Sequence, residues 1–223
     1  MVADPTGAGE GGVPPRGTAI CSVRRFVPLG GTPEVPEGPG GTDRVRCVIE
    51  IVEYRDAWPA LFAELGHRLR AGLGDVALRI DHIGSTAVPG MRAKPVIDIQ
   101  VSVGAFEPAD FRAPLEAAGF AFRAGNPDLT KRYFRETSGP RTHVHVRRAG
   151  SFAEQLCLLL RDYLRDSPAD AELYGARKAL LTERYDTDRR AYTGEKSSVV
   201  WELVRRADVW AQARGWQPGP SDA

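Results

Sequence analysis

The residues best suited to chemistry are concentrated in one stretch of the sequence. Residues 81–90 read Asp-His-Ile-Gly-Ser-Thr-Ala-Val-Pro-Gly. A strand that ends in Gly-Ser-Thr can present several backbone N–H groups and two hydroxyl groups at the turn that follows, and such a turn suits a phosphate. Gly84 lets the backbone approach the anion closely. Gly84, Ser85 and Thr86 are therefore the first candidate nucleotide-binding residues.

A carboxylate follows on the next predicted strand. Side chains alternate along a strand, so Asp98, Gln100 and Ser102 share one face while the apolar residues between them enter the core. An acidic residue among apolar neighbours needs a partner, and a hard divalent cation that bridges the carboxylate to a phosphate is one. The alternative is that Gly-Ser-Thr is an ordinary turn and Asp98 a half-exposed strand residue.

Two histidines form the third candidate group. His143 and His145 alternate onto one face of a predicted strand, in a chain that has four histidines. If they converge with Asp98, and His82 joins them, they form a mixed imidazole and carboxylate metal site or a general acid and base beside the phosphate. Imidazoles favour zinc, manganese or iron over magnesium. The alternative is that each histidine is structural.

Basic side chains from several parts of the chain are candidate phosphate ligands. Lys94 precedes Pro95, whose ring biases it to an extended conformation from which its ammonium group can point toward the turn. The other candidates are Arg132, Arg135, Arg141, Lys178 and Lys196. Guanidinium groups suit phosphate oxygens, and both of the later lysines follow a tyrosine by four residues, so each pair shares a helical face. For each of these side chains, simple solvation is the alternative.

The elements that must position these groups follow from the hydrophobic periodicity. Strands are predicted over residues 45–54, 76–83, 96–103, 120–122, 132–135 and 143–147. Helices are predicted over residues 58–73, 111–118, 152–165, 168–185 and 188–214. The predicted fold class is α/β (α+β): a small mixed β-sheet with flanking helices and a helical C-terminal half.

Composition divides the chain into one domain and two tails. Residues 1–44 are rich in Gly and Pro and poor in large apolar side chains, which predicts a disordered N-terminal tail. The alternative is that translation starts downstream of Met1. A single domain is expected over residues 45–215, and a flexible C-terminal tail over 216–223.

Charge and cysteine content exclude several classes of protein. The 30 Lys and Arg residues balance 29 Asp and Glu residues, which argues against a binder of nucleic acid or anionic membranes. The longest apolar run is far short of the roughly 20 residues of a membrane span, and the N-terminus has no secretory signal pattern. Three cysteines without a CxxC pair suggest neither disulfides nor a thiolate metal site. A cytoplasmic location is expected.

The whole central string resembles a known superfamily. A Gly-Ser turn, twelve intervening residues and an Asp flanked by isoleucines are similar to the nucleotidyltransferases related to DNA polymerase beta. Within that superfamily the segment resembles the GrpB family, through His-Ile-Gly-Ser-Thr, Val-Pro-Gly, Lys-Pro and Ile-Asp-Ile between His82 and Ile99. The likeness continues at residues 131–135, 141–146 and 161–164, and covers most of residues 48–213.

The resemblance implies a fold of the nucleotidyltransferase type and a metal-dependent reaction. It implies transfer of a nucleotidyl group from a nucleoside triphosphate to an unknown acceptor, a small molecule or a protein, with Mg²⁺ or Mn²⁺, or else Zn²⁺. Asp98, His143 and His145 are then the catalytic candidates, and Asp98, Gln100 and His145 the metal ligands. The sequence departs from the polymerase-like pattern, because Gln100 replaces a second carboxylate and histidines stand where a third is expected. The oligomeric state is left open.

Two other functions are compatible with the same residues. One is a non-catalytic nucleotide-binding or partner module, as in proteins where a GrpB-like domain follows a dephospho-CoA kinase. No GxxxxGK[ST] motif is present in this sequence, so it carries no such kinase of its own. The other is a metal-dependent phosphohydrolase that uses the histidines.

Overall fold

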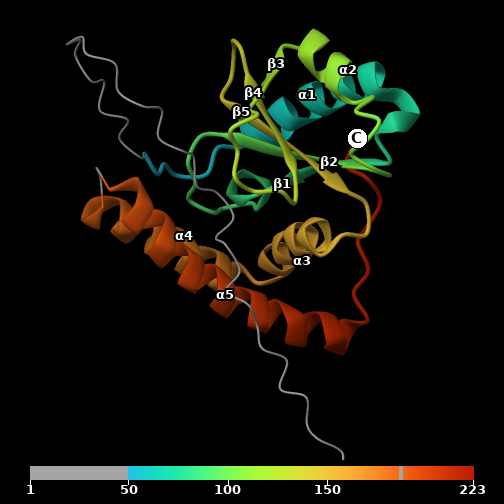
Figure 1. The fold of residues 1–223 in the computed structure, drawn as a ribbon. Coiled ribbons are helices and arrows are strands. Elements are labelled where there is room, and N and C mark those ends of the chain that lie inside the picture. Colours follow the sequence, from blue (N-terminus) through green and yellow to red (C-terminus); the bar gives the residue numbers. More distant parts are fainter. Residues whose placement is uncertain (1–49, 186–187) are drawn as a thin grey trace, which may run out of the picture.

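The computed structural model describes residues 50–185 and 188–223, and its centre is a five-stranded mixed sheet (Figure 1). The strands are β1 (Arg79–Ile83), β2 (Ile97–Val103), β3 (Phe120–Phe122), β4 (Arg132–Glu136) and β5 (Thr142–Arg148). Their order in the sheet is β1-β2-β5-β4-β3. The β2 and β5 strands are parallel, whereas the other neighbours are antiparallel.

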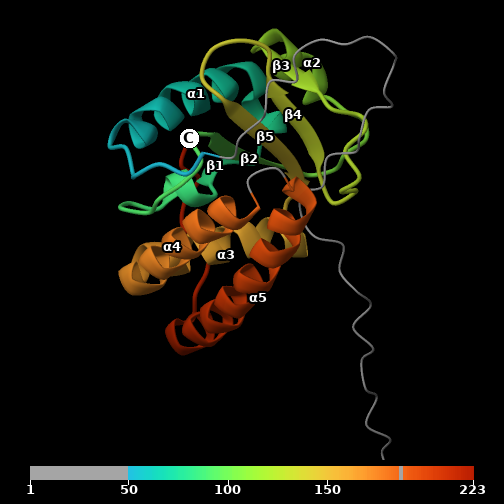
Figure 2. The same cartoon turned by 90° about the vertical axis from the view of Figure 1, so that its left-hand side faces the viewer.

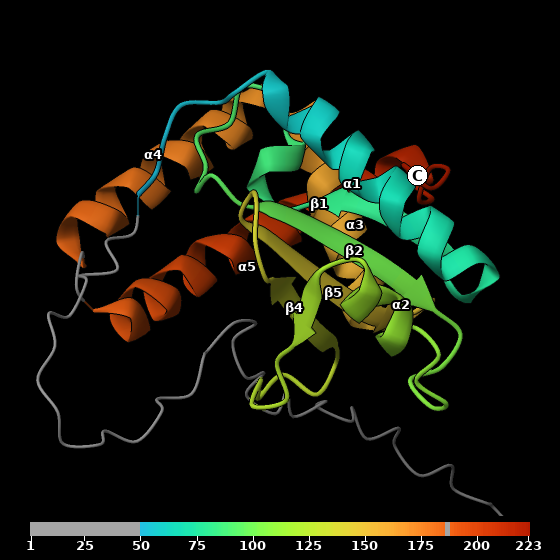
Figure 3. The same ribbon diagram turned by 90° about the horizontal axis from the view of Figure 1, so that it is seen from above.

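Within the described residues, five α-helices cover the two faces of the sheet. They are α1 (Ala57–Leu73), α2 (Arg112–Ala117), α3 (Phe152–Asp166), α4 (Pro168–Arg184) and α5 (Arg189–Arg214). The α1 and α2 helices lie over one face (Figure 3), and α3, α4 and α5 gather on the other side (Figure 2). This arrangement confirms the predicted fold class, a small mixed sheet with flanking helices and a helical C-terminal half.

Two hydrophobic clusters hold these layers together. One fills the space between the sheet and the α1–α2 layer, with side chains such as Phe62, Ile99 and Phe134. The other joins α3, α4 and α5 to the chain that follows β1, through Val88 and Met91 among others. Burial of apolar surface of this kind is the main stabilising term of a fold. The second cluster fixes the C-terminal helices against the Gly-Ser-Thr turn.

Strand register decides which polar groups face the helical C-terminal half. Asp98 lies opposite His143, and Gln100 lies opposite His145, in the parallel β2–β5 pair. Tyr133 lies opposite His145 in the β4–β5 pair. Residues that are directly opposite each other point to the same face of a sheet. These five side chains therefore share the face on which α3 packs.

The α3 helix is anchored to that face by its first turn. Ser151 caps the helix by accepting a hydrogen bond from the Glu154 backbone N–H. The fully buried Glu154 carboxylate accepts hydrogen bonds from the Ser102 hydroxyl at 2.7 Å and from the Gly150 backbone at 3.0 Å. A buried carboxylate requires such donors. The start of α3 is thereby fixed near the C-terminal end of β2.

The first predicted strand is wrong over the part that the structure describes. Residues 50–54 form no regular strand; Val52 makes an isolated bridge to Ala93. The β-branched residues of this segment favour extended backbone. However, residues 50–54 pair with the rest of the chain only through the bridge from Val52 to Ala93, and not with a neighbouring strand. Residues 45–49 of that strand, and the tail predicted over 1–44, lie outside the described residues.

The segment after α5 is docked on the domain, whereas the sequence predicted a flexible tail over 216–223. The Ile80 backbone N–H donates to the Ser221 hydroxyl at 2.8 Å, and the Ala223 N–H donates back to the Ile80 carbonyl at 3.1 Å. The buried Arg161 guanidinium donates to the Asp222 carboxylate at 2.9 Å. An edge strand such as β1 has unpaired N–H groups, and this segment satisfies them. Among the described residues, no helix combines the length and apolar character needed to cross a membrane.

Candidate metal and phosphate site

Asp98, His143 and His145 come together at the centre of the sheet. His143 Nδ1 lies 3.1 Å and His145 Nε2 lies 3.2 Å from the same Asp98 oxygen, Oδ1. One ligand atom from each residue can be chosen so that all three lie within 4.8 Å of one another. The structure brings these three predicted catalytic residues into one cluster, which has the spacing of a metal site with one carboxylate and two imidazoles.

The protonation states of this cluster suit a cation. Burial alone raises the pKa of the Asp98 carboxyl group, but hydrogen bonds from His143 and His145 outweigh it and hold the pKa well below its ordinary value. Burial lowers the pKa of His145 to about 4, although Asp98 opposes this effect. At neutral pH Asp98 is therefore ionised and His145 is neutral. The buried Nδ1 of His145 has no hydrogen-bond partner among the residues that the structure describes. Metal ligands require these deprotonated forms.

The Gly-Ser-Thr turn packs directly against the Asp98 carboxylate. Gly84 has a φ of 73°, in the left-handed region that glycine tolerates. A β-carbon added there would lie 2.8 Å from Asp98 Oδ2 and 3.2 Å from its β-carbon. Only glycine allows this approach, so the turn and the carboxylate are in contact through backbone.

A buried lysine from α4 holds the second residue of the turn. Lys178 Nζ donates to the Ser85 hydroxyl at 2.7 Å and to the Arg92 carbonyl at 2.6 Å. Its ammonium also lies 4.6 Å from the centre of the Tyr174 ring. Burial, followed by the positive charge of Lys196, lowers the pKa of Lys178 well below its ordinary value. Tyr174 and Lys178 occupy one helical face, as their spacing of four residues predicted.

The second predicted lysine reaches the same region from α5. The pKa of Lys196 is raised, mainly by Tyr174 and also by Tyr192 and Asp98. The negative charge of Asp98 is thus close enough to stabilise the Lys196 ammonium. Lys178, bound to the turn, and Lys196, electrostatically coupled to Asp98, therefore form a basic wall beside the turn and the metal-ligand cluster.

Comparison with known proteins identifies the family. A family model described as GrpB protein matches residues 48–206. The chain belongs to the GrpB family. The match covers the Gly84 turn, the Asp98 cluster and Lys178 and Lys196 of the basic wall.

Individual relatives support this assignment. UPF0157 protein PA4798 of Pseudomonas aeruginosa is 41% identical over 164 residues, which cover 71% of this chain and 67% of that protein. The crystal structure of conserved protein GrpB from Enterococcus faecalis matches with a TM-score of 0.65 at 31% identity, over 72% of this chain and 99% of that chain. A dephospho-CoA kinase of Mycobacterium tuberculosis is 34% identical over 206 residues, which cover 78% of this chain. The GrpB chain spans about half the length of that kinase, 49%.

His82 does not join the metal-ligand cluster of the GrpB chain. Its ring stacks on Phe62 of α1 with centroids 4.7 Å apart, and its Nε2 is 3.0 Å from the Thr86 hydroxyl. Thr86 in turn donates to the Val96 carbonyl at 3.2 Å. His82 neighbours Asp81 and Ile83 in β1, so alternation turns it to the α1 side of the sheet. His82 and Thr86 therefore support the turn from the α1 side of the sheet.

Acid is expected to destabilise the protein through His82. Burial lowers the His82 pKa from 6.5 to about 4, so between these values the unfolded chain binds a proton that the folded chain does not. The free energy of unfolding therefore falls as the pH drops from 6.5 to 4, by up to about 3 kcal/mol, and the effect is absent above 6.5. Urea unfolding of the wild type and of His82→Gln across pH 4–8 measures it. A constant difference between the two proteins would contradict the assignment.

Arg132, a predicted nucleotide ligand, lies on the wrong face of the sheet. It is opposite Val146, whereas the clustered histidines alternate to the other side. Its guanidinium lies 4.2 Å from the centre of the Phe106 ring and 4.0 Å from the Glu107 carboxylate. Neighbouring residues on a strand point to opposite faces of the sheet. Arg132 therefore points away from the histidines although the adjacent Tyr133 lies opposite His145.

Gln100 and Lys94 are neither clearly part of the cluster nor clearly outside it. Gln100 faces the same side as Asp98 but is fully buried, and its amide nitrogen donates to the Glu154 carbonyl at 3.3 Å. Its Oε1 has no hydrogen-bond partner within the described residues. Lys94 is half-buried in the segment that joins the turn to β2. For Gln100 as a metal ligand and Lys94 as a nucleotide ligand, the roles stay predictions.

Three side chains beside the cluster were not among the site residues predicted from the sequence. Tyr133 lies against both histidines, with ring centroids 5.5 Å from His143 and 5.3 Å from His145. The positive charges of Lys131 and Arg147 add to the lowering of the His145 pKa. The alternation of Lys-Arg-Tyr-Phe-Arg at residues 131–135 could have indicated Lys131 and Tyr133, because its odd-numbered positions share the face of the histidines. Arg147 follows His145 by two residues, so alternation along its own strand could have indicated it.

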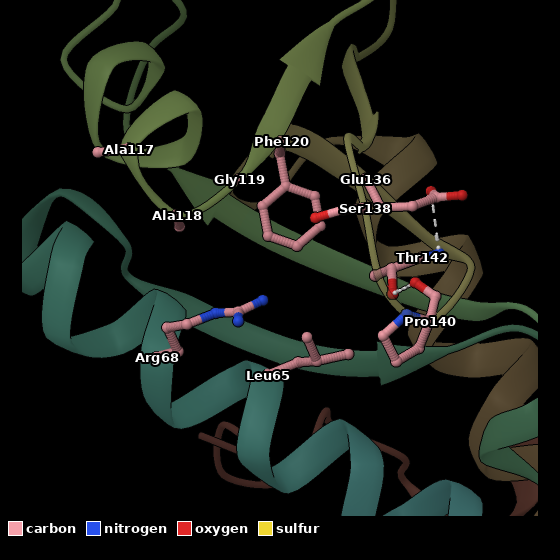
Figure 4. Close-up of a pocket in the computed structure, with 10 residues that line it drawn as sticks. All are labelled: Leu65, Arg68, Ala117, Ala118, Gly119, Phe120, Glu136, Ser138, Pro140 and Thr142. Atoms are coloured by element: carbon pink, nitrogen blue, oxygen red, sulfur yellow. Dashed lines mark hydrogen bonds between the residues drawn. The ribbon is translucent and has the colours of Figure 1, made fainter.

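Two partly open pockets in the described part of the chain lie away from this cluster. A cavity of about 280 Å³ lies between α1, α2 and the β4–β5 turn, and its lining includes Arg68, Phe120 and Glu136 (Figure 4). A second cavity, of about 330 Å³, lies beside α4 and is lined by Arg92 and Glu172 among others. Neither contains Asp98, His143 or His145. The Asp98 side chain of the cluster is 29% exposed and therefore partly accessible from solvent.

Proposed function

We propose that this GrpB protein binds a nucleoside triphosphate with a divalent metal ion and transfers a nucleotidyl group to an acceptor. The observation that carries this proposal is the contact between the Gly84 backbone and the Asp98 carboxylate. A cation held by Asp98 and a phosphate held by the turn would then be immediate neighbours. Bridging of a phosphate and a carboxylate by one metal ion is the arrangement that phosphoryl-transfer sites use.

The donor set fits a metal ion. Asp98 supplies an ionised oxygen, and His145 supplies a neutral imidazole whose Nε2 lies 3.2 Å from Asp98 Oδ1. One carboxylate with two imidazoles favours Mn²⁺ or Zn²⁺, whereas Mg²⁺ prefers oxygen ligands. When bound, the ion would act as a Lewis acid that neutralises phosphate charge. We therefore expect Mn²⁺ to support function better than Mg²⁺.

The basic wall would bind phosphate groups of the nucleotide and compensate their charge. Ser85 and Lys178, already hydrogen-bonded to each other, would hold the outer phosphates, and Lys196 would offset the charge between them and Asp98. In the transfer, an acceptor oxygen forms a bond to the α-phosphorus, its proton passes to a base, and pyrophosphate leaves with the electrons of the broken P–O bond. Positioning and charge neutralisation supply most of the catalysis in such reactions.

A metal-dependent phosphohydrolase is a second candidate, because the cluster contains two imidazoles and a single carboxylate. Water would then replace the acceptor. A nucleotide-binding module without turnover is the third, since Gln100 adds no second negative charge.

One assay separates the three functions. The protein is incubated with Mn²⁺ or Mg²⁺ and nucleoside triphosphates labelled at the α-phosphate, together with an extract of small molecules and proteins as acceptors. Label incorporated into an acceptor with release of pyrophosphate is the expected result. Release of phosphate or nucleotide without incorporation would indicate the hydrolase, and thermal stabilisation without turnover the binding module. Neither turnover nor stabilisation with any nucleotide would contradict the proposal.

A further inference from the structure

A second basic cluster lies beside the metal-ligand residues. Lys131 and Arg147 are 7% and 3% exposed, so both cations are buried. Lys131 Nζ lies 3.4 Å from Asp128 Oδ2. Arg147 donates to the Thr130 hydroxyl at 3.1 Å, and Thr130 is itself held by the Asp128 carboxylate. The Asp128 carboxylate is therefore the negative partner of both buried cations, directly for Lys131 and through Thr130 for Arg147.

Arg147 is the less well compensated of the two cations, because it reaches the Asp128 carboxylate only through Thr130. Within residues 50–185 and 188–223 it forms no ion pair, and its buried Nε has no hydrogen-bond partner. A buried guanidinium without such partners is costly. Burial, followed by the charge of Arg147, also lowers the pKa of Lys131, as expected for two cations that repel each other. The cluster is incomplete without an anion.

This basic cluster and the Gly84 turn lie on opposite sides of the metal-ligand residues. Arg147 follows His145 by two residues on the same face of β5, and Lys131 immediately precedes β4. The strand order β1-β2-β5-β4 places the Gly84 turn, at the end of β1, on the opposite side of Asp98 and the histidines. Lys131 nevertheless interacts electrostatically with Asp98. The metal-ligand cluster thus lies between two basic regions, the basic wall on one side and Lys131 with Arg147 on the other.

We propose that Lys131 and Arg147 form an oxyanion subsite that binds a phosphate group of the acceptor. The identification of the bound molecule as the acceptor rests on the proposed function. Binding of a phosphate group at this subsite requires neither metal nor nucleotide. A guanidinium fork beside an ammonium group matches the oxygens of a phosphate and adds charge-assisted hydrogen bonds. The excess of positive charge over Asp128 favours a phosphomonoester over a neutral acceptor.

The subsite can be tested with inorganic phosphate as the probe. Isothermal titration is done without metal or nucleotide, in a Lys178→Met background that removes the lysine of the turn. Phosphate binding is expected, and Lys131→Gln should weaken it by about tenfold through loss of a charge-assisted hydrogen bond. Arg132→Gln, on the opposite face of the sheet, is the matched control and should leave the affinity unchanged.

Asp128→Asn distinguishes a ligand site from a structural ion pair. Asparagine keeps the oxygen that accepts from Thr130, but removes the negative charge that competes with a bound anion. The subsite requires phosphate to bind several-fold more tightly in this variant. Unchanged or weaker binding would overturn the proposal, as would the absence of phosphate binding in every variant. Because no nucleotide is present, these outcomes do not depend on transfer activity, and Asp128→Asn decides the matter even if Lys131→Gln fails to fold.

A second measurement identifies the source of the phosphate group. Glycerol 3-phosphate and glycerol are compared as ligands in the same titration, with acetate as a singly charged anion. Binding of glycerol 3-phosphate that Lys131→Gln weakens is expected. Equal binding of acetate would show a general anion site and would overturn the assignment to a phosphomonoester.

Discussion

Asp98→Asn is expected to abolish metal-dependent nucleotide binding and any transfer. Asparagine has the same shape but cannot supply the negative charge on which both histidine hydrogen bonds converge. The affinity for Mn²⁺ should fall by about 100-fold, because loss of a direct charged ligand costs at least as much as the loss of an outer partner. Turnover should fall by about 10³-fold or more, as for removal of a group that stabilises charge in a transition state.

The matched control is Asp110→Asn, which removes an exposed carboxylate from the α2 side of the molecule. Isothermal titration with Mn²⁺ and thermal shift with nucleotide, each with and without metal, provide the measurements. Circular dichroism confirms that the variant is folded. If Asp98→Asn bound Mn²⁺ and nucleotide as the wild type does, the Asp98, His143 and His145 cluster would be a structural hydrogen-bond network.

Gly84→Ala is expected to cost both stability and metal affinity. The added β-carbon would lie 2.8 Å from Asp98 Oδ2, and the φ of 73° disfavours any side chain. Backbone strain together with overpacking predicts a loss of about 3 kcal/mol in the free energy of unfolding. The carboxylate must also move, so its geometry toward His143 and His145 changes.

Gly90→Ala provides an internal comparison six residues away. Gly90 has a φ of 75°, nearly the same backbone conformation, but nothing lies within 4 Å of a β-carbon placed there. Its replacement should therefore cost the strain alone, about 1 kcal/mol, and leave Mn²⁺ binding unchanged. Urea unfolding and Mn²⁺ titration of both variants measure the two effects. Equal losses of stability and unchanged metal affinity in both would show that the contact between turn and carboxylate has no functional role.

The two variants report on different parts of the proposed site. Asp98→Asn removes charge and leaves the shape, whereas Gly84→Ala leaves the charge and changes the shape. A site in which metal and phosphate must be neighbours is sensitive to both changes. A site that only binds a metal ion should respond far more to the first.

Much of the site could be predicted from sequence because it depends on local periodicity. Strand alternation placed Asp98 and Gln100 on one face, and the same rule placed His143 and His145 together. The glycine at position 84 indicated a close approach of backbone. Each of these inferences requires only the conformation of one segment, which its own residues largely determine.

The tertiary structure alone decided how those segments combine. Register between β2 and β5 set Asp98 against His143, and a one-residue difference sent Arg132 to the opposite face. The unpaired edge of β1 recruited Ser221 and Asp222, whose sequence is typical of a flexible tail. Lys131 and Arg147 became a charged pair only when β4 and β5 paired.

Sequence therefore determined which chemistry is available in this GrpB protein: a backbone turn, a carboxylate and two imidazoles. Only the tertiary structure decided which of the basic side chains faces that chemistry. The physical reason is that alternation fixes the faces of a strand relative to each other, whereas strand pairing and edge contacts fix which face meets which neighbour. Those contacts join residues far apart in the chain, so no local pattern encodes them.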